Sequence, residues 1–165
     1  MPGTRPGSPV RVLDVVKEAV STVCESRPVS TAITIDVSED LVVTGDSRAV
    51  EQIVENLVEN AVRYGGREGP VGVRAESSAT RVSIVVSDVG TGIEAADLAR
   101  IFERFYRVDP ARSRAEGGTG LGLSIVKHLA ESMGGSVSVE SELGKGTRFV
   151  VELPRSTVPE SPSRP

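Results

Sequence analysis

The sequence is poor in aromatic residues and contains one cysteine and no long hydrophobic run. Tryptophan is absent and aromatic residues make up 3% of the 165 positions, so a core must be built from aliphatic side chains. A single cysteine, Cys24, excludes an intrachain disulfide, and we interpret it as a small apolar residue at a helix end. No segment is long and apolar enough to span a bilayer, and residues 1–8 lack the apolar centre of a signal peptide.

The charge balance also excludes several classes of partner. The formal net charge is −4, whereas binding to nucleic acid requires a strongly basic surface. We expect a soluble cytoplasmic monomer that contacts neither nucleic acid nor membrane. Its length fits one compact domain, which we place at residues 9–154. Residues 1–8 and the Pro/Ser-rich residues 155–165 are expected to be disordered, because such compositions cannot bury a core.

Hydrophobic periodicity predicts an alternation of helices and strands. Apolar residues at helical spacing predict helices over residues 9–24, 46–64, 94–102 and 121–133. Alternating apolar residues predict strands over residues 33–37, 41–44, 71–75, 82–86, 137–139 and 149–153. Hairpins mixed with helices indicate an α+β fold, a two-layer sandwich whose mixed, mostly antiparallel sheet is covered on one face by helices.

The helix that follows Asp46, an expected N-cap, has three faces. Placed at about 100° per residue, one face is charged and another is apolar, comprising Val50, Ile53, Val54, Leu57, Val58 and Ala61. Asn56, Asn60 and Arg63 form a strip between these faces. Amide oxygens can bind Mg²⁺ and arginine can bind phosphate, so the strip is typical of a polar cleft. The alternative interpretation is an ordinary polar boundary on an amphipathic helix.

Three glycine-containing segments are further candidates for ligand contact. Asp88–Gly92 follows an apolar strand, and its glycines would let a ligand approach the backbone, although a plain turn has the same composition. Gly117–Leu123 opens a helix, where backbone N–H groups can bind an anion. It fits neither a Rossmann fingerprint nor a Walker P-loop, and a flexible loop with a helix cap remains the alternative. Gly144–Thr147 joins two strands and suits an ordinary hairpin turn.

Taken in order, these segments resemble the N, G1, F, G2 and G3 boxes of sensor histidine kinases. That family belongs to the ATPase superfamily that includes gyrase, Hsp90 and MutL, so the resemblance implies a Bergerat-type ATP-binding fold. The five boxes correspond to residues 56–61, 88–92, 102–106, 118–123 and 144–147. Residues 105–107 and 111–114 most resemble the phosphate-sensing branch of the actinobacterial type.

The resemblance implies ATP and Mg²⁺ as cofactors and a role for each matching residue. Asn60 would hold Mg²⁺, Asn56 would lie beside it at the phosphates, and Arg63 would contact phosphate, which makes these three the catalytic candidates. Tyr64 would stack on the adenine, and Asp88 would accept a hydrogen bond from the adenine amino group.

The same resemblance assigns the remaining nucleotide contacts. Residues 107–118 would form a lid over the triphosphate, which we expect to be mobile when no nucleotide is bound. The further positions implied to contact the nucleotide are Gly90, Gly92, Ile93, Arg107, Arg112, Gly118, Thr119, Gly120, Leu121, Gly122, Leu123 and Thr147.

The only histidine, His128, does not fit the phosphoacceptor of such a kinase. No acidic residue follows it, and it lies on the helix after the G2 box. We therefore expect a catalytic fragment that acts on a histidine of a separate helical hairpin in a parent kinase. That parent would be anchored in the bacterial inner membrane and would signal to a response regulator. The alternatives are a stand-alone anti-sigma-factor serine kinase of the same superfamily and a non-catalytic binding module.

Overall fold

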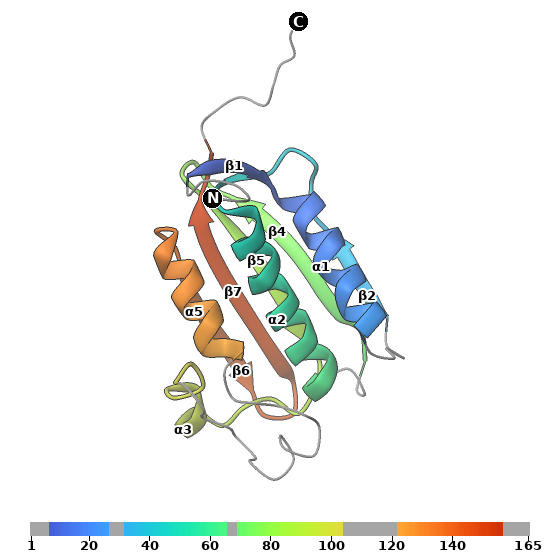
Figure 1. Ribbon diagram of the computed structural model, residues 1–165. Helices are drawn as coiled ribbons and strands as arrows, with labels where there is room; N and C mark the ends of the chain where they lie inside the picture. The colour runs from blue at the N-terminus through green and yellow to red at the C-terminus, as the bar shows by residue number, and fades with distance from the viewer. Residues whose placement is uncertain (1–6, 27–31, 66–68, 104–121, 157–165) are drawn as a thin grey trace, which may run out of the picture.

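The computed structural model describes residues 7–26, 32–65, 69–103 and 122–156, with the backbone alone for residues 64 and 65. Eleven labelled elements follow one another along this part of the chain (Figure 1). They are β1 Ser8–Arg11, α1 Val12–Ser26, β2 Ile33–Asp36, β3 Val42–Gly45, α2 Ser47–Gly65, β4 Val71–Ser77, β5 Arg81–Asp88, α3 Ala95–Leu98, α5 Gly122–Ser132, β6 Ser136–Glu142 and β7 Gly146–Pro154.

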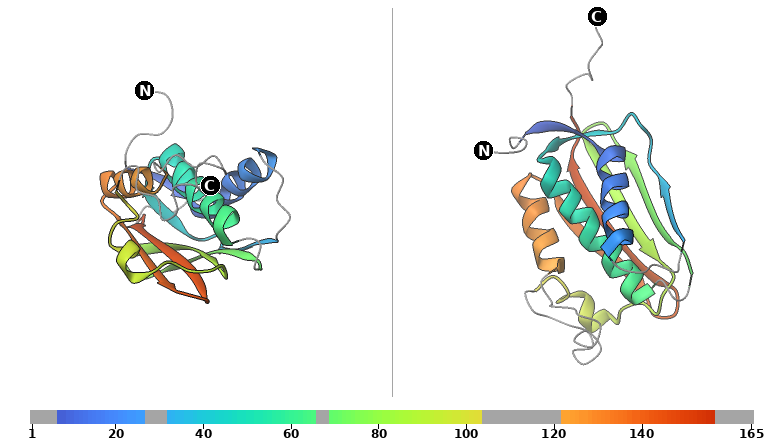
Figure 2. Two further views of the ribbon diagram at one scale, coloured as in Figure 1. Left: turned by 90° about the horizontal axis from the view of Figure 1, so that it is seen from below. Right: turned by 45° about the vertical axis from the view of Figure 1, so that its right-hand side comes forward.

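One five-stranded sheet forms the main layer. Its strands have the order β2-β4-β5-β7-β6, in which β2 and β4 run parallel and all other neighbours run antiparallel. Helices α1, α2 and α5 lie together on one face of this sheet (Figures 1 and 2). The predicted α+β sandwich with a mixed, mostly antiparallel sheet is therefore confirmed.

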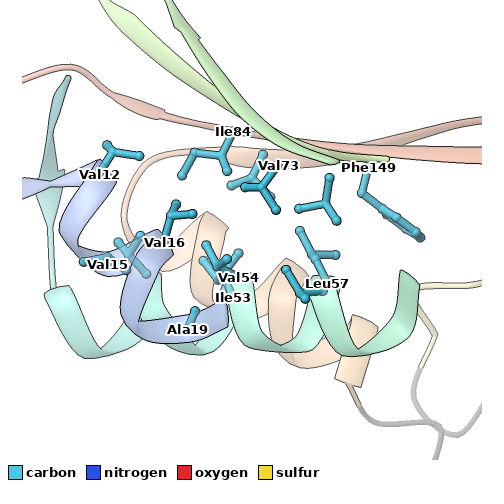
Figure 3. Packing of buried hydrophobic residues seen from close by; sticks show 14 of the residues in the cluster. Val12, Val15, Val16, Ala19, Ile53, Val54, Leu57, Val73, Ile84 and Phe149 are labelled. Atoms are coloured by element: carbon cyan, nitrogen blue, oxygen red, sulfur yellow. The ribbon is translucent and has the colours of Figure 1, made fainter. Parts of the chain in front are cut away.

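Helix α2 lies centrally on the sheet, and its apolar face, which follows the helical repeat, packs against the strands. Arg48 N and Ala49 N both donate to Asp46 Oδ1, at 2.9 and 3.3 Å, so Asp46 is the predicted N-cap. The six residues of the predicted apolar face are all buried. Figure 3 shows Ile53, Val54 and Leu57 on the side of α2 that faces the strands. The periodicity of this helix therefore predicted its orientation correctly.

Small aliphatic side chains fill most of the space between helices and sheet. Valine dominates the buried cluster, as expected from a sequence poor in aromatics. Phe149 of β7 is the largest buried side chain, and Phe102 packs edge-on against it, with ring centroids 6.1 Å apart. This contact fixes the segment after α3 against the sheet (Figure 3 shows Phe149).

Helix α5 covers the β6–β7 side of the sheet with its predicted face. Val126 and Ala130 are buried, and Leu123, Leu129 and Met133 pack partly buried against the core. The helix ends where predicted, because Gly134 adopts a φ of 81°, a value that a side chain would disfavour.

The start of the first helix was predicted wrongly. Pro9 and Val10 lie in β1, which pairs with β3 so that Val10 lies opposite Val43, and α1 begins only at Val12. Proline is tolerated there because an edge strand does not require every N–H group. Val10 is apolar and buried in either arrangement, so its periodicity could not separate strand from helix.

Backbone pairing also reaches residues on both sides of the expected domain, 9–154. Ser8, placed in the N-terminal segment expected to be disordered, pairs with Gly45 of β3. At the other end, Arg155 forms a bridge with Val43, and Ser156 N donates to the Val42 carbonyl at 2.9 Å. Backbone pairing to β3 therefore extends the folded region beyond residues 9–154 at both ends. Residues 1–6 and 157–165 lie outside the described part.

The predicted helix over residues 94–102 is shorter than expected. Only Ala95–Leu98 is helical, and the following residues form turns through Asp97–Arg100 and Arg100–Glu103 backbone bonds three residues apart. This tighter winding suits a segment that must bury Ile101 and bring Phe102 onto Phe149.

Candidate functional site

The candidate residues gather at one end of the molecule. The C-terminal end of β5, the N-terminal end of β7, the last turns of α2 and the first turn of α5 all lie at this end (Figure 1). These elements carry Asp88, Thr147, the Asn56–Arg63 strip and Gly122, respectively. Segments that are far apart in the sequence are thereby brought together at one end of the fold.

Three polar side chains form a row across the end of the sheet. Asp88 of β5 lies directly opposite Thr147 of β7, which in turn lies opposite Ser141 of β6. Residues that face one another across antiparallel strands project to the same face, here the face covered by helices. Thr147 is the only buried polar residue among those described, at 7% exposure.

Asp88 is held as a partly desolvated hydrogen-bond acceptor. Burial raises the pKa of its carboxyl above the ordinary value, and backbone hydrogen bonds from Gly90 and Thr147 offset part of that rise. The Gly90 N–H donates to Asp88 Oδ1 at 2.8 Å. These bonds hold the carboxylate in place, so that it can accept a further hydrogen bond from a ligand.

The loop after Asp88 is fitted closely to the β6–β7 hairpin. Gly92 has a φ of 82°, and a Cβ there would lie 2.4 Å from the Glu142 carbonyl oxygen. A Cβ at Gly146 would lie 2.1 Å from the carbonyl oxygen of Asp88. The Gly144 N–H donates to the Thr91 carbonyl at 2.8 Å. The turn over residues 144–147, which suited an ordinary hairpin in sequence, therefore packs directly against the loop after Asp88.

This close fit predicts that Gly92→Ala destabilises the protein more than Gly144→Ala. Both glycines have a positive φ, near 82° and 84°, but a Cβ at Gly144 would meet nothing within 4 Å. The backbone strain is then common to both variants, and only Gly92→Ala adds overpacking, which costs about 1–3 kcal/mol. Urea denaturation of the two variants measures this difference in the free energy of unfolding. Equal values would contradict the close approach.

The α2 strip meets the first residue of α5. A Cβ at Gly122 would lie 3.8 Å from both Cγ and Oδ1 of Asn56, an ordinary van der Waals contact, so Gly122 lies directly beside this amide. Asn56 Nδ2 is buried and has no hydrogen-bond partner within the described ranges. A buried unsatisfied donor costs about 1–3 kcal/mol, so this Nδ2 is a candidate donor to a ligand. Asn60 lies half-buried one turn further along the same face.

Arg63 lies near the end of the same strip. Its Nη2 is 3.2 Å from Glu59 Oε2, and the two side chains are 17% and 39% exposed. Glu59 therefore holds the guanidinium in place. The raised pKa of the neighbouring Glu55 carboxyl, caused first by burial and then by nearby glutamates, fits this acidic flank of α2.

Several predicted contacts lie outside the described residues. They are the side chain of Tyr64, the proposed lid over residues 107–118, and Arg107, Arg112, Gly118, Thr119, Gly120 and Leu121. Of the remaining predictions, Gly90 is buried, Ile93 is half-buried, and Leu123 packs against the core.

Ser141 belongs to the site, although sequence analysis missed it. Its hydroxyl accepts from the Ile93 N–H at 2.7 Å and lies 2.9 Å from Thr147 Oγ1. It therefore joins the loop after Asp88 to the hairpin. The usable signal was the spacing of six residues between Ser141 and Thr147 around the predicted turn, which places them opposite one another.

The described residues contain no group of three or more His, Cys, Asp or Glu side chains placed to hold a metal ion. Within the same ranges, no helix is long and apolar enough to cross a membrane.

Known sequences are similar to this chain over much of its length. The chain is 41% identical to the sensor-like histidine kinase SenX3 of Mycolicibacterium smegmatis over 157 residues, which are 93% of the chain and 40% of the relative. It is 42% identical to the sensor protein SrrB of Staphylococcus aureus over 112 residues, 68% of the chain and 19% of the relative. The chain thus spans well under half the length of these relatives.

Solved structures share both the fold and part of the sequence. The chain is similar to the mycobacterial sensor histidine kinase MprB, with a TM-score of 0.77 and 29% identity, covering 90% of the chain and 97% of MprB. It is also similar to full-length ShkA in complex with AMPPNP, with a TM-score of 0.78 and 32% identity, covering 94% of the chain and 32% of ShkA.

The model of one protein family matches more than half of the chain, including the candidate site. The match spans residues 45–157, from the start of α2 to the end of the sheet. The chain therefore belongs to the family of histidine kinase-, DNA gyrase B- and HSP90-like ATPases.

Proposed function

We propose that this chain is the ATP-binding catalytic domain of a two-component sensor histidine kinase. It binds ATP with Mg²⁺ and transfers the γ-phosphoryl group to a histidine on a separate dimerisation domain, from which a response regulator is phosphorylated. The domain works in the cytoplasm, where ATP is available, within a parent kinase anchored in the membrane. The histidine kinases SenX3 and MprB, the sensor protein SrrB and the complex of ShkA with AMPPNP, all of which the chain resembles, support this assignment.

The observation that carries the proposal is the half-buried Asp88 carboxylate in its row with Thr147. A carboxylate that cannot be fully hydrated favours a ligand that donates a hydrogen bond, and the adenine amino group is such a donor. AMPPNP, which is bound in the ShkA structure, contains the same base.

The α2 strip supplies the phosphate end of the proposed site. The Asn60 amide oxygen would hold Mg²⁺, whose remaining ligands would be phosphate oxygens and water. The unsatisfied Asn56 Nδ2 would donate to a phosphate oxygen, and the N-terminus of α5 at Gly122 would place backbone N–H groups beside it. Arg63 would add a fixed positive charge. When bound, Mg²⁺ neutralises charge that develops on the phosphates.

Transfer to histidine then requires an imidazole placed in line with the γ-phosphorus. One imidazole nitrogen attacks the phosphorus, the bond to the bridging β–γ oxygen breaks, and ADP leaves. His128 does not suit this role. It is exposed and lies further along α5, the helix whose N-terminus at Gly122 would face the phosphates.

A stand-alone serine kinase that controls a sigma factor remains the second candidate from sequence. It would use the same ATP site but a serine acceptor on a regulator. SenX3, SrrB and MprB, to which the chain is similar, are sensor proteins or sensor histidine kinases, which favours the first candidate.

Calorimetric titration with ATP and GTP, with and without Mg²⁺, tests the proposal. We expect ATP to bind more tightly in the presence of Mg²⁺, and to bind at least about tenfold more tightly than GTP. Guanine presents a carbonyl oxygen where adenine presents an amino group, so Asp88 would face an acceptor. Gln52→Ala, which changes an exposed amide on α2, serves as the control variant. Equal affinity for the two nucleotides would rule out the role of Asp88.

A further inference from the structure

Ser141 has a contact on every side of its hydroxyl group. Ser141 Oγ accepts from the Ile93 N–H at 2.7 Å, donates to the Gly146 carbonyl at 2.9 Å and lies 2.9 Å from Thr147 Oγ1. A serine hydroxyl has one hydrogen to donate and two lone pairs to accept with. Three contacts therefore use its full hydrogen-bonding capacity.

This count fixes the direction of the bond between the two hydroxyls. A carbonyl oxygen can only accept, so the single hydrogen of Ser141 goes to Gly146. The backbone N–H of Ile93 can only donate, and it occupies one lone pair of Ser141. The remaining lone pair faces Thr147, and the hydrogen in that contact must therefore come from the Thr147 hydroxyl.

We infer that Ser141 is a positioning residue for recognition of the base. By taking the only hydrogen of the Thr147 hydroxyl, it leaves Thr147 Oγ1 with nothing but lone pairs to present to a ligand or to a water beside it. Thr147 lies directly opposite Asp88, whose carboxylate is also an acceptor. In the described row, the Asp88 and Thr147 side chains thus offer acceptors only, and Ser141 maintains that state without touching the ligand.

An acceptor-only surface discriminates between bases by the group at position 6 of the purine. Adenine presents an amino group there, whose hydrogens complement Asp88 and Thr147. Hypoxanthine, the base of ITP, presents a carbonyl oxygen, which finds no donor while Ser141 holds the Thr147 hydrogen. Removing the Ser141 hydroxyl frees that hydrogen, so Thr147 can rotate and donate to the carbonyl. This inference rests on the nucleotide-binding function proposed above.

The test compares ATP and ITP affinities of the whole chain by calorimetry. In Ser141→Ala we expect the preference for ATP over ITP to fall about tenfold from the wild-type ratio. Ser141→Thr keeps the hydroxyl and should restore the ratio. Ser138→Ala is the matched control, because Ser138 is an exposed serine of the same strand. If Ser141→Ala does not fold, Ser141→Cys, whose thiol is a weak donor and acceptor, should shift the ratio in the same direction.

The ratio separates positioning from a purely structural role. If Ser141 acted only through its contact with Ile93, its loss would weaken the binding of ATP and of ITP equally and leave the ratio of their affinities unchanged. That result would overturn the inference. Failure of the wild-type chain to bind ATP would instead overturn the proposed function. A ratio that falls in Ser141→Ala and recovers in Ser141→Thr is the result we expect.

Discussion

Incubated with radiolabelled ATP, the chain alone will incorporate almost no label, and His128→Ala will not change that amount. Attack on the γ-phosphorus requires a separation of about 3–3.5 Å, and a misplacement of 1 Å can cost roughly 100-fold in rate. His128 follows Gly122 by six positions along α5, which corresponds to about 9 Å. A rigid helix cannot return its own side chain to a phosphate at its N-terminus.

The matching positive control supplies an acceptor in trans. A helical hairpin that contains the phosphoacceptor histidine of a related sensor kinase should become labelled at least about 100-fold more than the chain alone. The label should be acid-labile, as expected for a phosphohistidine, and confined to that histidine. Strong acid-labile labelling of the isolated chain that disappears in His128→Ala would contradict the proposal that the acceptor is external.

Replacing Asn60 with alanine should remove the effect of Mg²⁺ on nucleotide binding. Asn60 is only half-buried, and alanine is the best helix former, so α2 should remain folded. A metal ion that stabilises phosphate charge contributes several kcal/mol, so the affinity for Mg²⁺-ATP should fall roughly 100-fold. Calorimetry with Mg²⁺ and with EDTA measures both states of the ligand.

Gln52→Ala again provides the control, since it removes an exposed amide from the same helix. Its Mg²⁺-ATP affinity should equal that of the unmodified chain. An Asn60→Ala variant that binds Mg²⁺-ATP as tightly as the control would show that this amide does not hold the metal.

Elements whose pattern is local could be predicted from the sequence. The apolar face of α2 and the N-cap at Asp46 follow from spacings within one helix, and both agree with the structure. The start of α1 could not be predicted, because Val10 becomes a strand residue only through pairing with Val43, more than thirty positions away. Such long-range pairing decides structure wherever the local periodicity suits both helix and strand.

The site shows the same division between local and long-range information. Asn56, Asn60, Asp88 and Thr147 could be proposed because each belongs to a short motif in a fixed order. Ser141 could not be chosen on composition, since β6 also contains exposed serines, and only the register of β6 against β7 brings it to Thr147.

The attachment of both flanks to β3 has a mechanical consequence. Ser8 pairs with Gly45 of this short strand, and Ser156 N donates to its Val42 carbonyl. Both contacts lie at the opposite end of β7 from Gly146. Eight steps along β7 correspond to about 27 Å. A pulling force, a fluorescent fusion or a surface tether applied at either flank is therefore borne by β3, while the opposite end faces away from the attachment. The chain can be immobilised through either flank with its Asp88–Thr147 end open to the solution.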